Sequence, residues 1–386
     1  MRVLAVHNHY QLPGGEDAVF AAETKALEEA GHEVERLTID NHSIDGALAA
    51  IKAAGSAVYN AQSRQIVADR IARFRPDVMH VHNLFPLLSP SIFDASKEAG
   101  VASVWTLHNY RLTCANGLLF RGNRPCDRCV GRSPLPGVVH RCYRGSLGAS
   151  AAAAASISAH RLLGTWTSKV DRFIALTSFA KSKFVEAGVP AASIAIKANS
   201  VPDPGVGKPW AERTGFIYVG RLSVEKGVDC LIEAAKIAET PLTIYGDGPE
   251  RERLQREASP NVVFAGWQDA PVIADAIASA QALVVPSLWY ENFPMVMVEA
   301  MAAGTPIIAS RLGALEAIIS EGYNGALFSA GDAHDLARVI SSLAREPAKL
   351  ETMGQGARRF YDENSAPKVN LARQLEIYRD AIETAR

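Results

Sequence analysis

Two glutamates stand eight positions apart where a loop leads into a helix, with Glu291 just before the helix and Glu299 about two turns inside it. Pro294 suits the first turn of that helix, because a residue there needs no backbone N–H, and the run from Gly304 to Pro306 is a stop signal. At about 3.6 residues per turn, this spacing brings both acids to nearly the same helix face, where one ligand could contact both.

The surroundings of Glu299 favour a binding site over a surface helix with two solvated acids. The helix is largely apolar, so Glu299 lies in a segment that we expect to be buried, and a buried carboxylate needs partners. The backbone of Asn292, Phe293 and Pro294 lies at the positive end of the same helix, where free N–H groups hold anionic or hydroxyl-rich ligands. A polyol phosphate fits these features.

Two cations, Arg221 and Lys226, follow another expected strand in a loop that Gly227 closes before a helix. Two cations beside a helix N-terminus suit a diphosphate, because the helix supplies N–H donors and the side chains neutralise charge on a leaving group. The alternative is a surface arginine and lysine on an ordinary turn.

The N-terminal half adds two candidate positions. Gly14 and Gly15 follow the first strand, where paired glycines let the backbone approach phosphate oxygens, although an ordinary flexible turn has the same composition. His108 ends a strand and could hydrogen-bond a sugar hydroxyl or shuttle a proton near neutral pH; a structural histidine is the alternative. His80 and His82 also end a strand, and we interpret them as structural.

The candidate residues above can form one site only if the fold brings the ends of their strands together. Short apolar strands alternate with helical stretches, which is the rhythm of a parallel, doubly wound α/β sheet. The motifs above follow the carboxyl ends of expected strands, where such folds bind ligands. Strands are expected over residues 2–8, 33–39, 77–83, 102–109, 172–177, 215–221, 242–246, 262–266, 282–286 and 306–310.

Length and composition limit the classes of protein. The 386 residues exceed the usual size of a single core, so two domains are expected, and a hydrophobic content of 48% supplies both cores. Forty basic and 41 acidic residues give a net charge of −1, which argues against a dedicated nucleic-acid-binding protein. No apolar run approaches about 20 residues, and the start of the chain is typical of a buried strand rather than a signal sequence. We therefore expect a cytosolic protein, in which structural disulfides are disfavoured.

In order and type, these motifs resemble those of the retaining glycosyltransferases of the two-Rossmann-domain (GT-B) architecture, specifically the large fourth family typified by bacterial mannosyl and glucosyl transferases. The E-x7-E signature described above is that family's hallmark. Three further segments match in the right order, Gly220–Gly227, Ile244–Pro249 and Phe264–Trp267. The likeness is densest over residues 216–328 and thinner upstream. It implies two Rossmann-like parallel-sheet domains that face one another across a cleft.

The resemblance also implies roles for the charged residues. Arg221 and Lys226 would neutralise the diphosphate in place of a divalent ion, and no Asp-x-Asp motif for such an ion is evident. Glu299 would hold the ribose hydroxyls, and Glu291 the hydroxyls of the transferred sugar. Retaining transfer in this family is generally viewed as front-face attack, in which the leaving phosphate accepts the proton of the acceptor. Glu291 would then position and stabilise rather than attack.

The same resemblance implies further contacts with the donor. Gly15 would contact the donor phosphate, and His108, in a Thr-x-His context, would lie near the donor sugar. The positions expected to border the base are Gly266, Trp267 and Gln268. Those expected to orient the sugar through their backbone are Asn292, Phe293 and Pro294.

The expected domain organisation follows from the strand series and the resemblance. Residues 1–200 form an acceptor-side Rossmann-like domain with a cysteine-rich insertion at 110–145. Residues 201–212, rich in proline and glycine, are the linker, and residues 213–366 form the nucleotide-sugar-binding domain. A final helix over 367–386 is expected to return to the N-terminal domain.

Four cysteines crowd the insertion, and the better-known family members lack this feature. Their C-x11-C-x2-C-x12-C spacing suffices for tetrahedral zinc, so we expect a structural zinc ion; free thiols, disulfides and an iron–sulfur centre stay open. Nearby arginines suit an anionic acceptor such as a lipid diphosphate, or form a solvated face. The Ala-rich helix over 148–165 is expected to pack on this segment or to touch a membrane surface. The cysteines are Cys114, Cys126, Cys129 and Cys142.

The sequence thus predicts a retaining, metal-ion-independent hexosyltransferase. It is expected to move a sugar from a nucleotide-diphosphate sugar to a glycan or lipid-linked acceptor in bacterial surface polysaccharide synthesis. The expected location is the cytoplasm, at the inner face of the membrane. An NAD(P)-dependent oxidoreductase is the first alternative, because Asp40 ends the second strand, but no G-x-G-x-x-G follows the first strand. A noncatalytic sugar-nucleotide-binding protein is the second, and the presence of Arg221, Lys226, Glu291 and Glu299 disfavours it.

Overall fold

A computed structural model describes residues 1–9, 14–40, 58–85 and 87–385 of the chain. These residues form two compact units. The first unit comprises Met1–Leu119, Cys126–Ala198 and Asn370–Arg386, and the second comprises Phe120–Pro125 and Asn199–Val369. None of the described helices is long and apolar enough to cross a membrane.

The first unit is built on a six-stranded parallel sheet in the order β2-β1-β3-β4-β5-β6. Most of its strands are buried along almost their whole length, as expected where helices cover both faces of a sheet. The strands are β1 (Arg2–His9), β2 (Glu33–Asp40), β3 (Val78–Val81), β4 (Ala102–Leu107), β5 (Arg172–Ala175) and β6 (Ile194–Ile196). The helices that precede the last segment are α1 (Gly15–Glu29), α3 (Ala61–Phe74), α4 (Ile92–Glu98), α5 (Leu135–Val139), α6 (Leu147–Leu162), α7 (Thr165–Ser168) and α8 (Ser178–Glu186).

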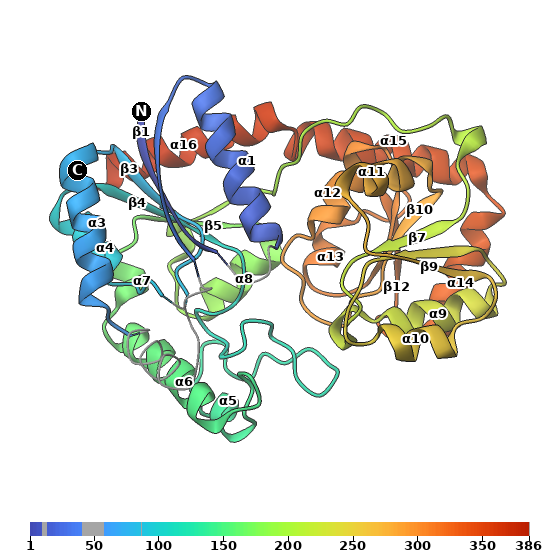
Figure 1. The fold of residues 1–386 in the computed structure, drawn as a ribbon, viewed down its shortest axis with the longest axis horizontal. Coiled ribbons are helices and arrows are strands. Elements are labelled where there is room, and N and C mark those ends of the chain that lie inside the picture. Colours follow the sequence, from blue (N-terminus) through green and yellow to red (C-terminus); the bar gives the residue numbers. More distant parts are fainter. Residues whose placement is uncertain (10–13, 41–57, 86, 386) are drawn as a thin grey trace. The chain divides into compact units, whose positions relative to one another are not determined.

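The last helix of the chain, α16 (Pro367–Ala385), completes the core of the first unit (Figure 1). Ile377 and Tyr378 on this helix pack in one buried cluster with Val3 and Val78 from the first and third strands. Because these side chains are almost fully buried, the sheet of the first unit depends on residues from both ends of the chain.

The second unit has its own six-stranded parallel sheet, in the order β12-β11-β10-β7-β8-β9. Its strands are β7 (Phe216–Val219), β8 (Leu242–Tyr245), β9 (Val262–Gly266), β10 (Ala282–Val285), β11 (Ile307–Ser310) and β12 (Gly325–Phe328). Its helices are α9 (Val228–Ile237), α10 (Arg251–Glu257), α11 (Ala270–Ser279), α12 (Met295–Ala302), α13 (Ala314–Ile318), α14 (Ala333–Ala344) and α15 (Pro347–Asn364).

Each sheet has one point at which the strand order reverses. In the first sheet, β1 has β2 on one side and β3 on the other, and in the second sheet β7 has β8 on one side and β10 on the other. Loops at the carboxyl ends of strands diverge at such a point and leave a crevice that binds ligands in open α/β sheets. Any site in either unit is therefore expected beside β1 and β3 or beside β7 and β10.

The expected fold class, two parallel α/β sheets, is confirmed. All ten expected strands form, and their ends differ from the expected ones by at most two residues. The strands β6 and β12, three and four residues long, were not predicted. The strand β6 is largely unburied and β12 begins with glycine, which is disfavoured in strands, so neither has a clear strand pattern.

Candidate active site

Lys226 and Glu291 meet where the strand order of the second sheet reverses. Lys226 ends a short 3₁₀ turn after β7, and Glu291 lies in the loop after β10. The Nζ atom of Lys226 is 2.7 Å from Oε1 of Glu291, and the hydroxyl of Ser287 donates a hydrogen bond of 2.7 Å to the same oxygen. The Glu291 side chain is buried, while 24% of the Lys226 side chain is exposed. The Nζ atom of Lys226 also lies 5.3 Å from the ring centre of Trp289. The site thus offers a partly exposed cation backed by a buried acid.

Close backbone packing brings the two loops together. Gly227 has φ +65°, and a Cβ at this position would lie 2.1 Å from the carbonyl oxygen of Pro286 after β10. The N–H of Leu288 donates a hydrogen bond of 2.8 Å to the carbonyl of Glu225. Only glycine accommodates both this backbone angle and this contact, so residue 227 allows Lys226 to reach Glu291.

Arg221 lies in the same loop as Lys226, and its side chain is exposed. The hydroxyl of Tyr218 donates a hydrogen bond of 2.9 Å to the carbonyl of Arg221. Burial, and then the nearby charge of Glu291, raise the pKa of Tyr218, so this hydroxyl keeps its proton. Gly246 packs against the start of the loop, where a Cβ would lie 1.9 Å from the carbonyl oxygen of Gly220. The backbone at Arg221 is therefore fixed while its guanidinium faces solvent.

Glu299 lies in the second turn of α12 and is partly buried. Burial raises the pKa of Glu299, and no described residue forms an ion pair with it. The helix begins at Met295, so Pro294 is the residue before its first turn rather than within it. The carbonyl of Phe293 accepts a hydrogen bond of 3.0 Å from the amide of Asn199, which ties down the loop in front of the helix.

Three of the expected donor-binding residues lie at the end of β9. Gly266 ends that strand with φ +72°, and Trp267 after it is 70% exposed. The amide of Gln268 donates a hydrogen bond of 2.8 Å back to the carbonyl of Ala265. A Cβ at Gly266 would lie 3.6 Å from the guanidinium of Arg251, a cation that the sequence motifs did not indicate. An exposed indole and a guanidinium thus flank the same strand end.

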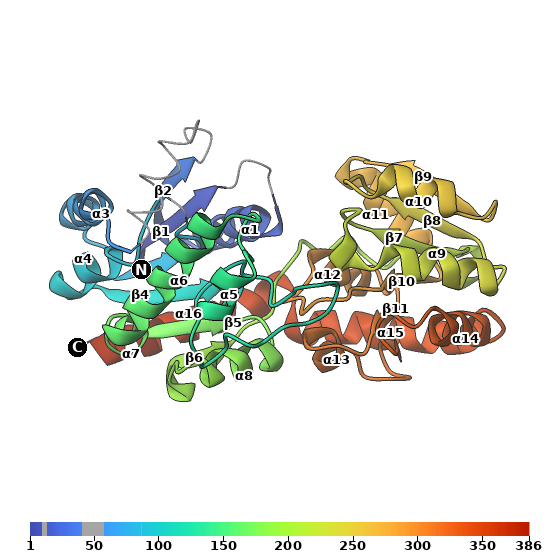
Figure 2. The ribbon, with the colours of Figure 1, turned by 90° about the horizontal axis from the view of Figure 1, so that it is seen from below.

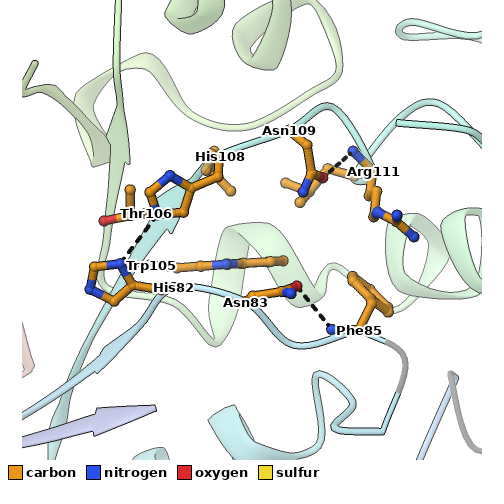
Figure 3. Close-up of a pocket in the computed structure, with 10 residues that line it drawn as sticks. His82, Asn83, Phe85, Trp105, Thr106, His108, Asn109 and Arg111 are labelled. Carbon is orange, nitrogen blue, oxygen red and sulfur yellow. Dashed lines mark hydrogen bonds between the residues drawn. The ribbon is translucent and has the colours of Figure 1, made fainter. Parts of the chain in front are cut away.

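In the first unit, His108 follows β4 in a small pocket at the carboxyl ends of β3 and β4 (Figure 3). Its Nε2 atom is 3.2 Å from Nδ1 of His82. Burial lowers the pKa of His108 to about 4, so the imidazole is neutral near pH 7 and suits hydrogen bonding better than proton shuttling. The pocket is lined by His82, Asn83, Phe85, Trp105, Thr106, Leu107, His108, Asn109, Arg111 and Leu112.

The two histidines that we interpreted as structural have different surroundings. His80 has Nδ1 2.7 Å from the hydroxyl of Tyr378 on α16 and Nε2 2.8 Å from the hydroxyl of Thr106, so both of its ring nitrogens have partners in the core. His82, in contrast, contacts His108 in the pocket. Only His80 has the surroundings of a purely structural residue.

A buried ion pair lies behind the histidines. The Nζ atom of Lys197 is 2.5 Å from Oε1 of Glu23, and both side chains are almost fully buried. The other carboxylate oxygen of Glu23 is 3.7 Å from Nε2 of His82. Sequence motifs did not reveal this pair, although Glu23 stands among the apolar residues on the buried face of α1, and an acid in such a stripe is a usable signal.

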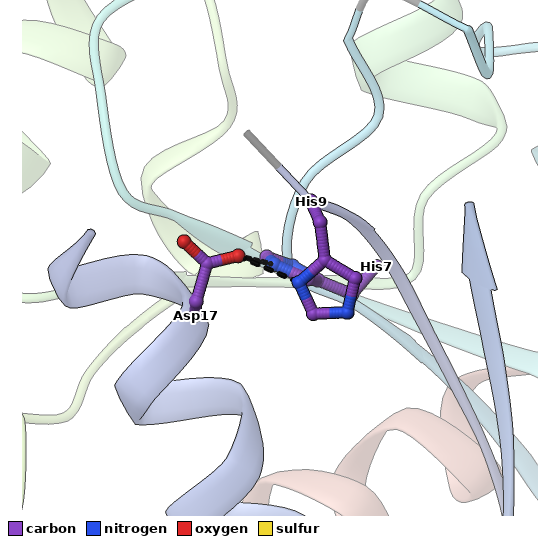
Figure 4. A group of neighbouring side chains, drawn as sticks. All are labelled: His7, His9 and Asp17. Atoms are coloured by element: carbon purple, nitrogen blue, oxygen red, sulfur yellow. Dashed lines mark hydrogen bonds and ion pairs between the residues drawn. The ribbon is translucent and has the colours of Figure 1, made fainter. Parts of the chain in front are cut away.

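A third group of polar side chains joins β1 to the start of α1 (Figure 4). One oxygen of Asp17 lies 2.9 Å from Nε2 of His7 and 2.7 Å from Nδ1 of His9, and its other oxygen accepts a 2.8 Å hydrogen bond from the N–H of Gly14. These ligand atoms are close enough together for a metal ion, but hydrogen bonds already link them. Gly15 is the exposed first residue of α1, and the preceding part of the expected phosphate loop lies outside the described residues.

The geometry of the cysteine-rich segment does not support the expected zinc ion. None of the five cysteines, all of which lie in the described part of the chain, forms a disulfide. Burial raises the pKa of Cys114 and of Cys129, and the neighbouring thiols add to this effect. The Sγ atom of Cys114 donates to the side-chain oxygen of Asn116 at 2.9 Å. In the described part of the chain, no three cysteine sulfurs lie within 4.8 Å of one another.

Comparison with known proteins gives two matching family models. Residues 14–200 match the model described as "Glycosyl transferase 4-like domain", and residues 209–360 match "Glycosyl transferases group 1". Similar curated proteins include the lipopolysaccharide 1,6-galactosyltransferase of Salmonella typhimurium, 34% identical over 50% of this chain and 58% of that protein. The sulfoquinovosyl transferase of Arabidopsis thaliana is 34% identical over 38% of this chain and 30% of its own length. The first four curated relatives are matched over 30% to 58% of their length.

Solved structures with the same fold cover nearly the whole chain. The lipopolysaccharide outer core galactosyltransferase WaaB has a TM-score of 0.67 at 19% identity, over 98% of this chain and 99% of that one. A sucrose-phosphate synthase from Thermosynechococcus elongatus has a TM-score of 0.69 at 18% identity, over 98% of both chains. HepE of Anabaena, solved in complex with UDP, has a TM-score of 0.66 at 18% identity, over 97% and 99%. At these identities the likeness establishes the fold.

Proposed function

Because this chain belongs to the group 1 glycosyltransferases, the retaining fourth family with the GT-B fold, we propose that it moves a hexose from a nucleotide-diphosphate sugar to a glycan or lipid-linked acceptor. The pair of Lys226 and Glu291 carries this proposal, since it lies where the strand order reverses, inside the segment that matches the family. A cation beside a buried acid suits a donor that carries a diphosphate next to sugar hydroxyls.

In this proposal the second unit binds the donor. Lys226 and Arg221 neutralise the diphosphate, and the exposed guanidinium of Arg221 is free to turn toward it. Glu291 accepts hydrogen bonds from hydroxyls of the sugar while Ser287 holds its carboxylate in place. Glu299, partly buried and without a charged partner among the described residues, accepts the ribose hydroxyls, because a buried carboxylate gains from such donors.

The backbone and the exposed ring system complete the donor site. The loop before α12 orients the sugar, with Phe293 anchored through Asn199. The base lies at the end of β9, where the exposed indole of Trp267 offers a stacking face. The remaining contacts of this part of the site are Asn292, Pro294 and Gly266.

The transfer itself needs positioning more than a protein nucleophile. The bond from the anomeric carbon to the diphosphate oxygen breaks, and a bond to the acceptor oxygen forms on the same face of the sugar. The proton of the acceptor hydroxyl passes to the departing phosphate oxygen. Lys226 and Arg221 stabilise the charge that builds up on this phosphate, and Glu291 holds the ring in place.

The first unit is the acceptor side in this proposal, and two of its residues, His108 and Gly15, also contact the donor. His108 is neutral near pH 7 and hydrogen-bonds a sugar hydroxyl at the carboxyl end of β4. Gly15, at the start of the 15-residue helix α1, places backbone N–H groups toward a phosphate of the donor. The domain boundaries expected from the sequence, with a linker over 201–212, belong to the same proposal.

A lipid-linked acceptor is favoured by the surface of the cysteine-rich segment and α6. Residues 111–163 contain eight arginines and one acidic residue, although the whole chain is nearly neutral. The exposed face of α6 carries Leu147, Ala151, Ala155 and Leu162, spaced by four, four and seven positions, with no charged residue among them. Exposed apolar residues beside arginines suit the surface of a membrane that contains anionic lipids. This supports a location at the inner face of the cytoplasmic membrane.

The printed activities of relatives support the choice of substrates. Among them are a galactosyltransferase for lipopolysaccharide and a GDP-mannose-dependent α-mannosyltransferase, the latter 39% identical over 30% of this chain and 27% of its own length. A protein from a Klebsiella pneumoniae cps region is 29% identical over 45% of this chain. We infer a role in synthesis of a bacterial surface polysaccharide from these relatives. Contacts near Trp267 decide which sugar and which base are bound, and a panel of sugar nucleotides identifies them.

Donor binding and turnover of Lys226→Met test the function. A panel of uridine, guanosine and adenosine diphosphate sugars is measured by thermal shift, since a ligand at about 100 times its Kd adds roughly 2.7 kcal/mol of stability. The sugar nucleotide that stabilises the wild type should lose most of this effect in Lys226→Met, and release of nucleoside diphosphate should fall about a hundredfold or more.

The matched control is Lys236→Met, which removes an exposed lysine paired with Glu233 on α9 and should leave turnover unchanged. Stabilisation by a sugar nucleotide without any transfer to glycan or lipid acceptors would point to a noncatalytic binding protein. Full turnover in Lys226→Met would contradict the proposed site.

The zinc ion expected in the cysteine-rich segment stays a prediction. All four thiols belong to the first unit, but no three of their sulfur atoms lie within 4.8 Å of one another. Elemental analysis of the purified chain checks it, and a fully folded protein without zinc would contradict it.

A further inference from the structure

A line of four side chains runs from the interior of the first unit to the pocket of His108. Lys197 contacts one carboxylate oxygen of Glu23 at 2.5 Å, and the other carboxylate oxygen faces Nε2 of His82 at 3.7 Å. The opposite ring nitrogen of His82 is 3.2 Å from Nε2 of His108. His82 therefore has an anion on one side and His108 on the other. Figure 3 shows the contact between the two histidines.

Glu23 is an anion in the folded protein. Burial alone would raise the pKa of this carboxyl, but the charge of Lys197 and its hydrogen bond outweigh burial and lower it. Two buried atoms, Oε2 of Glu23 and Nε2 of His82, have no hydrogen-bond partner among the described residues, and they face one another. At 3.7 Å the contact is too long for a hydrogen bond, so its effect on His82 is electrostatic.

The anion selects one of two proton arrangements in the histidine pair. Burial keeps His82 neutral by lowering its pKa well below the ordinary value, so one ring nitrogen carries a proton and the other is an acceptor. If the proton is on Nε2, the N–H points at Glu23. If it is on Nδ1, the lone pair of Nε2 faces the carboxylate, which is repulsive in a buried site.

The tautomer of His82 determines the tautomer of His108. With its proton on Nε2, His82 offers the lone pair of Nδ1, so Nε2 of His108 must carry the proton that joins the two rings. A neutral His108 then has its own lone pair on Nδ1. None of the residues that the structure describes forms a hydrogen bond to that atom, and this leaves it able to accept a hydrogen bond from a ligand in the pocket.

We propose that Glu23, held in place by Lys197, acts as a positioning residue that fixes the tautomer of His108 through His82, so that Nδ1 of His108 is a hydrogen-bond acceptor for a substrate hydroxyl. His80 does not compete for this role, because its two nitrogens are occupied by Tyr378 and Thr106. The tautomer follows from the side chains alone, and only its effect on turnover rests on the proposed function.

Nitrogen NMR of the full chain labelled with ¹⁵N-histidine tests the tautomer directly. Near pH 7, the wild type should show His108 with its proton on Nε2, and the signals are assigned by their loss in His108→Gln. The double variant Glu23→Gln/Lys197→Met removes the anion without leaving an unpaired buried lysine, and it should move the proton of His108 toward Nδ1. Glu28→Gln, on the exposed side of the same helix and paired with Arg36, is the matched control and should change nothing.

The double variant should also lower kcat by about tenfold to a hundredfold, while KM for the donor changes much less, because a hydrogen bond to the reacting sugar is weakened. A wild-type His108 that carries its proton on Nδ1, or on both nitrogens, would overturn the proposal even if the double variant failed to fold. An unchanged tautomer in a folded double variant would also overturn it. A chain with the expected tautomer but no transferase activity would contradict the proposed function alone.

Discussion

At the scale of residues, each unit pairs a buried acid with a cation in the segment that follows a strand. Glu23 is paired with Lys197 in the first unit, and Glu291 with Lys226 in the second. The two pairs differ in exposure, since Lys197 is almost fully buried and Lys226 is not. A fully buried pair holds its neighbours in place, whereas a partly exposed cation can leave its partner for a ligand.

The low pKa of His108 predicts how acid destabilises the first unit. Its pKa is about 4 in the folded protein against an ordinary value of 6.5. As pH falls between these values, the unfolded chain takes up a proton that the folded chain does not, so the free energy of unfolding decreases, by about 3 kcal/mol from this residue. His7, His80 and His82 act in the same direction, because burial lowers their pKa too. The apparent melting temperature of His108→Gln should therefore fall less steeply with acidification than that of the wild type.

The matched control for this measurement is His334→Gln, which removes an exposed histidine on α14. It should follow the wild-type curve from pH 7 to pH 4.5. Parallel curves for His108→Gln and the wild type would show that His108 titrates normally.

At the scale of elements, glycines let the loops after β7 and β8 interlock. The N–H of Leu222 donates to the carbonyl of Asp247 at 2.9 Å, and a Cβ on Gly248 would lie 2.3 Å from the carbonyl oxygen of Leu222. These contacts join backbone to backbone, so no flexible side chain could move aside. The loop that carries Arg221 therefore has its shape set by the neighbouring strand.

Gly248→Ala should separate these two loops. The methyl group has no room, and we expect a loss of about 1 to 3 kcal/mol in the free energy of unfolding, together with weaker binding of the donor because Arg221 moves. Differential scanning fluorimetry with and without the sugar nucleotide measures both. Gly148→Ala on α6 is the control, since a Cβ there would meet nothing within 4 Å. Equal melting temperatures and donor shifts in the two variants would contradict the interlocking role.

At the scale of the whole molecule, positive charge is concentrated in one stretch of the sequence, residues 111–163, most of which belongs to the first unit. Residues 111–163 contain no lysine and eight of the chain's arginines, while the full chain has a net charge of −1. Large apolar side chains are exposed in the same region, including Leu135 and Val139 on α5 and Leu162 and Leu163 at the end of α6. The helices α5 and α6 lie side by side (Figures 1 and 2). This combination suits the surface of an anionic membrane.

Vesicle flotation tests this surface. The chain should bind vesicles that contain phosphatidylglycerol, bind poorly to vesicles of phosphatidylcholine alone, and lose binding as salt is added. Leu162→Ser/Leu163→Ser should weaken binding about tenfold, because two exposed leucines can no longer enter the lipid. Val263→Ser, at an exposed apolar residue of the second unit, is the control. Equal binding to both kinds of vesicle, or an unaffected double variant, would contradict a membrane surface here.

The sequence predicted the elements better than it predicted the networks between them. The ten expected strands formed, because most of them have an apolar run bounded by turn residues. Lys226 and Glu291 could be selected because each stands beside glycine or proline signals at a strand end. Glu23 and Lys197, in contrast, are 174 positions apart, and nothing in the local sequence pairs them. Contacts of this kind depend on strand order, which the sequence pattern does not specify.

A crystal structure with the best-stabilising sugar nucleotide tests the central claim most directly, namely that Lys226 and Glu291 together bind the donor. The account predicts that phosphate oxygens lie within hydrogen-bond distance of Nζ of Lys226 and of the guanidinium of Arg221, with sugar hydroxyls at Glu291 and the ribose at Glu299. A diphosphate bound away from the carboxyl ends of β7 and β10, with the contact between Lys226 and Glu291 intact and unoccupied by ligand, would contradict it.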